Sequence, residues 1–322
     1  MNYRTLGATG ISVSEIGFGT WGIGGLTEGA TSYGETDDAV SLRALARALE
    51  LGMNFYDTSN IYGHEGHAEA LLGEAFGNQR ERVVLATKVG CVKHGGPYDV
   101  SPSYIRSCLE ASLRRLKTDY VDVYQLHSVP LELVRETPEC FATLRELKKE
   151  GKIRAIGYSV KNPSDAKTAI EEFGVDVVQL NFNMMDQRAL TEGIFDVARV
   201  RGVGIIVRTP FAFGFLTGKV TDTQFDSRDH RSVWSPAQLA RWRESPNVFS
   251  PVNDKGIYTP AQFALKFCVA FPEVSTVVAG MLTETQAEEN ATASDLPPLT
   301  AAQLAAIRKI REVNTFFVSE KK

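Results

Sequence analysis

The sequence predicts a single (β/α)₈ barrel, on three observations. Candidate strands alternate with candidate helices from residue 38 almost to the C-terminus, and the chain holds eight candidate parallel strands. No low-complexity linker or break in composition divides the 322 residues. Eight β/α units in one continuous chain are typical of this barrel. A doubly wound sheet is the alternative, but it would usually leave a recognisable second domain, so we predict one domain over residues 1–322.

The predicted strands are short apolar or β-branched runs, and most neighbours are separated by one helix. Before them, residues 3–6 and 11–16 flank the turn Gly7-Ala8-Thr9-Gly10 and predict an N-terminal β-hairpin. The eight barrel strands are predicted at 16–19, 54–57, 83–88, 120–127, 153–159, 177–181, 203–209 and 275–279.

The helices are predicted from apolar residues at helical spacing and from capping residues such as Ser101 before Pro102. The connection 210–259, after the seventh strand, is far longer than a typical loop. It lies on the face where barrel loops build sites, so we expect it to be functional. The helices are predicted at 38–51, 67–76, 102–116, 137–149, 162–173, 189–201, 260–271, 284–292 and 300–314.

Composition excludes several classes of protein. The net charge of −4 provides no general attraction to nucleic acid or to anionic membranes. No apolar run approaches the roughly 18 residues of a membrane span. The four cysteines are scattered without C-x-x-C spacing, which indicates reduced thiols. We expect a cytoplasmic protein without nucleic-acid or membrane partners, and the oligomeric state stays open.

Two local motifs are rejected. The stretch Gly17-Phe18-Gly19-Thr20-Trp21-Gly22 matches the dinucleotide fingerprint G-x-G-x-x-G, but its last glycine should open a helix and instead a glycine-rich loop continues. The stretch His64-Glu65-Gly66-His67 suggests metal ligands, but Gly66 interrupts the helix and no third ligand is evident. We predict no metal site.

Four polar residues gather at the ends of three successive strands. Asp57, Lys88 and His127 each close a strand, and Tyr62 follows in the loop after the first. Buried polar groups need partners, so we expect mutual contacts. An ammonium beside a phenol lowers the phenol pKa from about 10, and a carboxylate would hold that ammonium. Each residue alone also fits a structural role, but together they predict a proton-transfer site in which His127 orients a carbonyl or relays a proton.

A series of short stretches along the chain belongs to one known pattern. They are Gly17-Phe18-Gly19-Thr20-Trp21, Asn54-Phe55-Tyr56-Asp57-Thr58, Tyr62-Gly63, Ala86-Thr87-Lys88, Asp119-Tyr120-Val121-Asp122 with His127, Gly151-Lys152-Ile153-Arg154, Gly214, Leu216-Thr217-Gly218-Lys219, Gly280, Gln286 and Glu289-Asn290. With them the chain resembles the aldo-keto reductases over essentially its whole length. The resemblance implies a (β/α)₈ barrel with NAD(P)H extended across the mouth. It also implies a catalytic tetrad on Tyr62, Lys88, Asp57 and His127, with hydride passing between nicotinamide and carbonyl carbon while the tyrosine donates a proton to the oxygen.

By the same resemblance, Ser159 and Gln179 contact the nicotinamide amide, the residues after the seventh strand line the pyrophosphate, and those after the eighth strand hold the adenosine end. A helix N-terminus near residue 283 would also favour phosphate. The implied cofactor-binding residues are Gly19, Thr20, Trp21, Ser159, Gln179, Arg208, Pro210, Phe211, Gly214, Leu216, Lys219, Gly280, Leu282, Gln286, Glu289 and Asn290.

Three positions depart from the family pattern. Val160 follows Ser159 where the family often has asparagine, and Arg208 stands where an aromatic ring often stacks on the nicotinamide. Leu282 replaces an arginine that commonly binds the 2′-phosphate of NADP. Losing that charge-assisted contact weakens a preference for NADP by about 1 kcal/mol or more. The cofactor is therefore predicted as NADP by family, with NAD also possible.

The resemblance implies an NAD(P)(H)-dependent oxidoreductase acting on a small carbonyl or alcohol, such as an aldehyde, ketone or keto-sugar. Trp21, with Tyr56 or Asn60 at neighbouring strand ends, is predicted to supply an apolar wall for the substrate. The alternative is a nucleotide-binding regulatory barrel with little turnover, like the channel-associated relatives of this family. The intact tetrad favours the enzyme.

Overall fold

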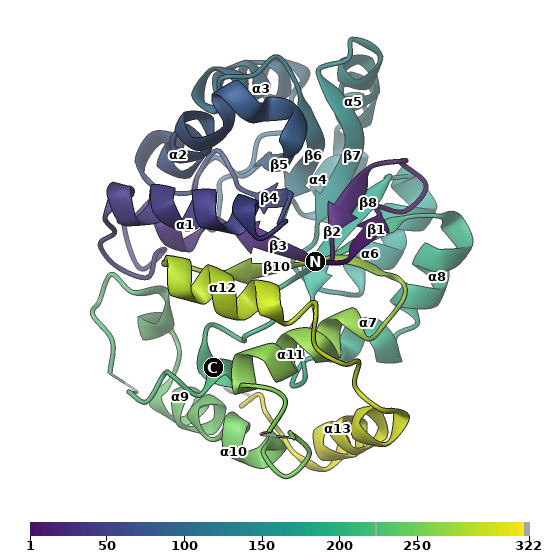
Figure 1. Cartoon of the computed structure of the whole chain (residues 1–322). Helices are drawn as coiled ribbons and strands as arrows, with labels where there is room; N and C mark the ends of the chain where they lie inside the picture. Colours follow the sequence, from purple (N-terminus) through teal and green to yellow (C-terminus); the bar gives the residue numbers. More distant parts are fainter. Residues whose placement is uncertain (223, 255, 319–322) are drawn as a thin grey trace.

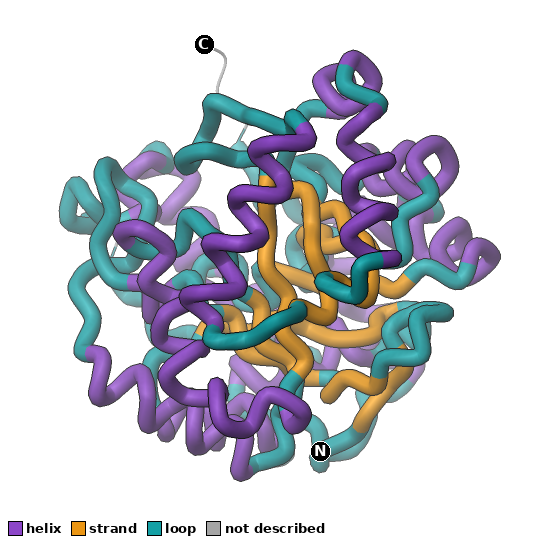
Figure 2. Tube along the Cα trace, turned by 90° about the horizontal axis from the view of Figure 1, so that it is seen from above, coloured by secondary structure: helices purple, strands orange, loops and turns teal. Residues whose placement is uncertain are grey.

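Eight parallel strands form a closed barrel, as predicted. The computed structural model describes residues 1–222, 224–254 and 256–318. The strands follow one another around the barrel in chain order, and the last pairs with the first. Figures 1 and 2 show the strands enclosed by helices. The barrel strands are β3 (Ile16–Gly19), β4 (Phe55–Asp57), β5 (Val84–Val89), β6 (Val121–His127), β7 (Ile153–Ser159), β8 (Val177–Asn181), β9 (Gly204–Arg208) and β10 (Val274–Gly280).

The predicted N-terminal hairpin covers one end of the barrel. β1 (Tyr3–Thr5) and β2 (Ser12–Ser14) form an antiparallel pair of their own. Leu6 and Val13 are fully buried and pack into the cluster that fills the barrel interior. Gly7 has φ +55°, and a Cβ there would lie 2.3 Å from the backbone nitrogen of Gly204. The hairpin turn therefore needs glycine to approach the barrel wall.

Most predicted helices are confirmed, but three differ in detail. The predicted helix 137–149 begins after Pro138, and a separate short helix precedes it. The predicted helix 162–173 ends in a wide π-helical turn. The predicted helix 189–201 is broken at Gly193, whose φ is +74°. The helices are α1 (Asp38–Glu50), α2 (His67–Phe76), α3 (Pro102–Leu116), α4 (Leu131–Glu136), α5 (Glu139–Lys149), α6 (Asp165–Thr168), α7 (Arg188–Thr191), α8 (Ile194–Arg201), α11 (Pro260–Val269), α12 (Glu284–Thr292) and α13 (Ala301–Val313).

The long connection 210–259 contains two further helices, α9 (Pro236–Arg243) and α10 (Ser245–Phe249). Trp242 of α9 is 1% exposed and packs against Phe213, Phe215 and Trp234. Gln238 of α9 donates a hydrogen bond of 2.8 Å to the carbonyl of Phe316 near the C-terminus, and Figure 1 shows α9 and α10 on the same side of the barrel as α13. An aromatic cluster therefore anchors this connection.

Alternation along the strands divides the barrel interior into two layers. The inward residues Phe55, Ala86 and Ile206 belong to a buried apolar cluster. Two positions later on the same strands stand Asp57, Lys88 and Arg208. The apolar layer fills the barrel, and the polar layer above it faces the mouth. Among the helices that the structure describes, none combines the length and apolarity of a membrane span.

Candidate active site

The carboxylate of Asp57 joins four strands at the mouth of the barrel. Lys88 Nζ donates to Asp57 Oδ1 over 2.5 Å. Gln179 Nε2 and Gln125 Nε2 both donate to Asp57 Oδ2, over 2.7 Å and 3.1 Å. Asp57 is only 4% exposed. Gln125 was missed at the sequence level, although it lies two residues before His127 and therefore shares its inward face.

Lys88 connects Asp57 to the phenol of Tyr62. Lys88 has no exposed surface, and its Nζ donates to the carbonyl of Thr58 over 2.7 Å and to the Tyr62 hydroxyl over 3.2 Å. Burial opposes the charged form of Lys88, but Asp57 and Tyr62 outweigh burial and raise the pKa of Lys88 above its usual range. The side chain therefore stays an ammonium.

The phenol of Tyr62 stays protonated, which differs from the predicted shift. Burial raises its pKa above the usual range, and this outweighs the lowering by the Lys88 ammonium. The expectation of a lowered pKa was wrong because it counted the neighbouring charge and neglected the loss of water around the ring. A neutral, buried phenol beside an ammonium is suited to donate a proton.

The ring of His127 packs against the ring of Tyr62. Their rings meet edge to face, with centroids 5.8 Å apart. Burial, followed by the positive charges of Lys88 and Arg208, lowers the pKa of His127 well below its usual range, so the imidazole is neutral. Its Nδ1 shares a hydrogen bond of 3.1 Å with the Ser59 hydroxyl, a contact that sequence reasoning did not find.

A cavity of about 560 Å³ opens above this group. Asp57, Tyr62 and His127 line it, whereas Lys88 lies beneath the surface. One limb of the cavity is bounded by aromatic and imidazole rings, namely Trp21, Tyr33, His94, Tyr98 and His230. The lining residues from the segment after β9 and from residues 280–290 form what we call the other limb. Of the predicted cofactor residues, those lining the cavity are Gly19, Thr20, Trp21, Gln179, Arg208, Pro210, Phe211, Gly214, Lys219, Gly280, Leu282, Gln286, Glu289 and Asn290.

Two predicted substrate residues do not line the cavity. Tyr56 has no exposed surface, stacks on Phe18 and donates its hydroxyl to the carbonyl of Met53. Because Asp57 points into the barrel, its neighbour Tyr56 must point outward. The side chain of Asn60 instead accepts a hydrogen bond from Ser59. Trp21 does line the cavity, with its ring centroid 6.4 Å from that of Tyr62.

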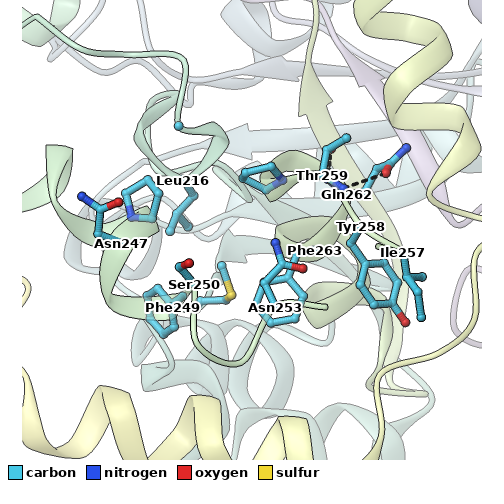
Figure 3. A pocket seen from close by; sticks show the side chains of 14 residues that line it. Leu216, Asn247, Phe249, Ser250, Asn253, Ile257, Tyr258, Thr259, Gln262 and Phe263 are labelled. Carbon is cyan, nitrogen blue, oxygen red and sulfur yellow. Dashed lines mark hydrogen bonds between the residues drawn. The ribbon is translucent and has the colours of Figure 1, made fainter. Parts of the chain in front are cut away.

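Two predicted cofactor residues also lie outside the cavity lining. Ser159 is 1% exposed and donates to Gln179 Oε1 over 3.1 Å. The Leu216 side chain faces a second cavity of about 500 Å³, shown in Figure 3. This second cavity lies on the outer side of the segment after β9. Its polar lining residues include Asn247, Ser250, Asn253 and Gln262.

Leu282, where the resemblance implies an arginine, lies just before α12. Leu282 lines the cavity, and its Cδ2 lies 2.7 Å from the position that a Cβ on Gly22 would take. Thr283 caps α12 by accepting from the backbone nitrogen of Gln286. Glu289 forms an ion pair of 2.6 Å with Lys219, so a carboxylate and an ammonium face each other across this limb.

Comparison with known proteins agrees with the fold. The model of the Aldo/keto reductase family matches residues 15–312. An uncharacterized oxidoreductase of Bacillus subtilis, YqkF, is 30% identical over 96% of this chain and 96% of its own length. An NADH-specific methylglyoxal reductase of Escherichia coli is 29% identical over 95% and 97%. The holo form of aldo-keto reductase AKR11C1 from Bacillus halodurans superposes with a TM-score of 0.79 at 30% identity, covering 100% and 99% of the two chains. The chain therefore belongs to the aldo/keto reductase family.

Proposed function

We propose that this oxidoreductase reduces a small aldehyde, ketone or keto-sugar with a nicotinamide cofactor, and that Tyr62 is its general acid. The observation that carries the proposal is the hydroxyl of Tyr62, which lines the cavity and receives a hydrogen bond of 3.2 Å from a fully buried ammonium. A proton donor held this way beside open space is suited to a substrate oxygen.

The protein groups have separate tasks in this reaction. When bound, the nicotinamide supplies a hydride to the carbonyl carbon. Tyr62 donates its proton to the carbonyl oxygen, and Lys88 stabilises the phenolate that remains. Neutral His127, which lines the same cavity, orients the carbonyl oxygen. Hydride and proton together convert C=O to an alcohol, and the reverse sequence oxidises an alcohol.

The other limb of the cavity has residues that suit a dinucleotide. It is bordered by the segment Pro210 to Lys219 and by residues 280–290, including the capped N-terminus of α12. Arg208 also lines this cavity, and its guanidinium adds a positive charge there. These residues supply donors for a pyrophosphate and room for an adenosine.

We infer that NADH and NADPH bind with comparable affinity. Leu282 offers no charge to a 2′-phosphate, and Glu284 and Glu288 of α12 already occupy Arg43 and Arg47 in ion pairs. These two arginines are therefore already paired with carboxylates and give little extra attraction to a 2′-phosphate. The Escherichia coli relative named as NADH-specific supports NADH as one of the cofactors.

The ring-lined limb is the proposed substrate pocket. The Trp21 ring lies 6.1 Å from that of His94 and 4.9 Å from that of His230, so the three form one wall. Burial lowers the pKa of both histidines. Neutral imidazoles next to an indole suit an uncharged substrate with a few hydroxyl groups.

The test is the pair Tyr62→Phe and Tyr56→Phe. Each removes one phenol hydroxyl, from the loop after β4 and from β4 itself. We expect Tyr62→Phe to lower kcat by at least about a hundredfold while cofactor affinity is kept, and Tyr56→Phe to keep full turnover. NADPH oxidation would be followed with a panel of aldehydes, ketones and keto-sugars. Full activity of Tyr62→Phe would refute the proposed role. A wild-type protein that binds cofactor without turning over any of the panel would favour the regulatory barrel.

A further inference from the structure

We propose that Arg208 is a fixed positive charge at the nicotinamide end of the cavity, which makes the protein bind the reduced cofactor more tightly than the oxidised one. This inference rests on the proposed function, because it concerns the same nucleotide. In this role Arg208 selects the reduced form of the cofactor. When the reduced and oxidised forms are both present, the enzyme then works mainly as a reductase.

The side chain of Arg208 spans the mouth of the barrel. Arg208 ends β9, pairs in register with Asn181 of β8, and donates from Nη2 to the carbonyl of Val160, just after β7, over 2.9 Å. The guanidinium therefore reaches across the end of β8, where Gln179 stands. Val160 and Arg208, two departures from the family pattern, are thus joined by a hydrogen bond.

The charge of Arg208 has no dedicated counterion among the residues that the structure describes. The carboxylate of Asp57 is bound by the Lys88 ammonium at 2.5 Å. The carboxylate of Asp186 is held by both arms of Arg188, at 2.8 Å and 2.7 Å. Within residues 1–222, 224–254 and 256–318, Arg208 itself donates only to a neutral carbonyl, and its Nε has no partner. A guanidinium remains charged in proteins, so the cavity carries an uncompensated positive charge.

The chemistry fixes where the nicotinamide ring must lie. Hydride and proton arrive on the two atoms of one C=O bond, so the ring lies within a few ångströms of the Tyr62 hydroxyl. Arg208 lines the same cavity, its charge acts on Tyr62, and it is followed directly in the chain by Thr209 and Pro210, which begin the other limb. Any dinucleotide joining the two must pass Arg208.

The two redox forms differ by one charge at this place. Loss of a hydride leaves the ring as a pyridinium with one positive charge, whereas the reduced ring is neutral. Arg208 therefore repels the oxidised ring and is indifferent to the reduced one. The oxidised cofactor leaves more readily and competes less with the reduced form, and the proton donor Tyr62 then meets mostly reduced cofactor.

The experiment compares dissociation constants of NADH and NAD⁺ for the wild type, Arg208→Gln and Arg208→Lys, from quenching of tryptophan fluorescence. We expect Arg208→Gln to lower the ratio Kd(NAD⁺)/Kd(NADH) by about 15- to 30-fold, the size expected for two unit charges about 8–10 Å apart in a medium of effective dielectric about 20. Arg208→Lys keeps the charge and should keep most of the ratio. A ratio unchanged in Arg208→Gln overturns the inference.

ADP-ribose, which lacks the nicotinamide ring, is the matched probe. Its affinity should be the same for the wild type and Arg208→Gln. An equal loss of affinity for ADP-ribose, NADH and NAD⁺ would mean that Arg208 binds the pyrophosphate, and this overturns the inference while leaving the proposed function intact. A wild-type protein that binds no nicotinamide nucleotide would instead overturn the proposed function.

Discussion

Replacing Lys88 by methionine separates the structural from the chemical role of the buried ion pair. Lys88 has no exposed surface and holds Asp57 at 2.5 Å. Removing one partner of a buried pair costs roughly 3–5 kcal/mol, because the other charge is left without compensation. Asp57 keeps two amide donors, from Gln125 and Gln179. We therefore expect Lys88→Met to lower the free energy of unfolding by about 3 kcal/mol, at the low end of that range.

The double variant Asp57→Asn with Lys88→Met is the control. It removes both charges, so it should recover most of the lost stability while remaining inactive, since Tyr62 still lacks its ammonium. Urea unfolding without cofactor, followed by tryptophan fluorescence and far-ultraviolet circular dichroism, measures both variants, and coincidence of the two probes checks two-state behaviour. A double variant as unstable as the sum of its single variants would refute the reasoning, because the two side chains would then act independently.

Three further changes test other parts of the site. Gly157→Ala would place a Cβ 2.6 Å from Cγ of Gln125, so we expect turnover to fall as that amide is pushed from Asp57, with circular dichroism unchanged; normal turnover would contradict this. Leu282→Arg should lower Kd for NADPH by about tenfold and leave Kd for NADH unchanged, whereas an equal gain for both would indicate a contact to the pyrophosphate. The pKa of His127 is lowered well below its usual range, so the unfolded chain binds the proton more readily. Stability of the wild type should therefore fall as the pH drops below about 6.5, by up to about 1.4 kcal/mol per pH unit relative to His127→Gln; parallel pH profiles would contradict the burial argument.

The barrel followed from local signals because each β/α unit repeats the same pattern. The strand ends at Asp57, Lys88 and His127 were visible as polar residues closing apolar runs, and chain order placed them side by side. The break at Gly193 was missed because apolar periodicity continues across it, whereas backbone geometry does not. The short helix α4 was missed because its six residues are too few for a clear periodic pattern.

The parts of the site that escaped the sequence depend on packing across the chain. Ser59 meets His127 only because the loop after β4 reaches the end of β6, and the ring wall joins Trp21, His94 and His230 from three separate connections. To predict the direction of the Tyr62 pKa shift, one must know how deeply the ring is buried as well as which charges surround it. Tyr56 is a different case, since the two-residue alternation of the strand already indicates that it cannot share the inward face of Asp57.

The bonds from Asp57 to β5, β6 and β8 have a consequence for how activity is lost. These strands cannot part at the mouth without breaking the contacts that align the proton donor. Local opening that leaves the rest of the barrel closed is therefore costly here, and backbone amides at these strand ends should exchange with solvent only through global unfolding. Molecules that are folded but misaligned are then rare, so mutations that weaken the barrel away from these contacts reduce the number of active molecules rather than the turnover of each one.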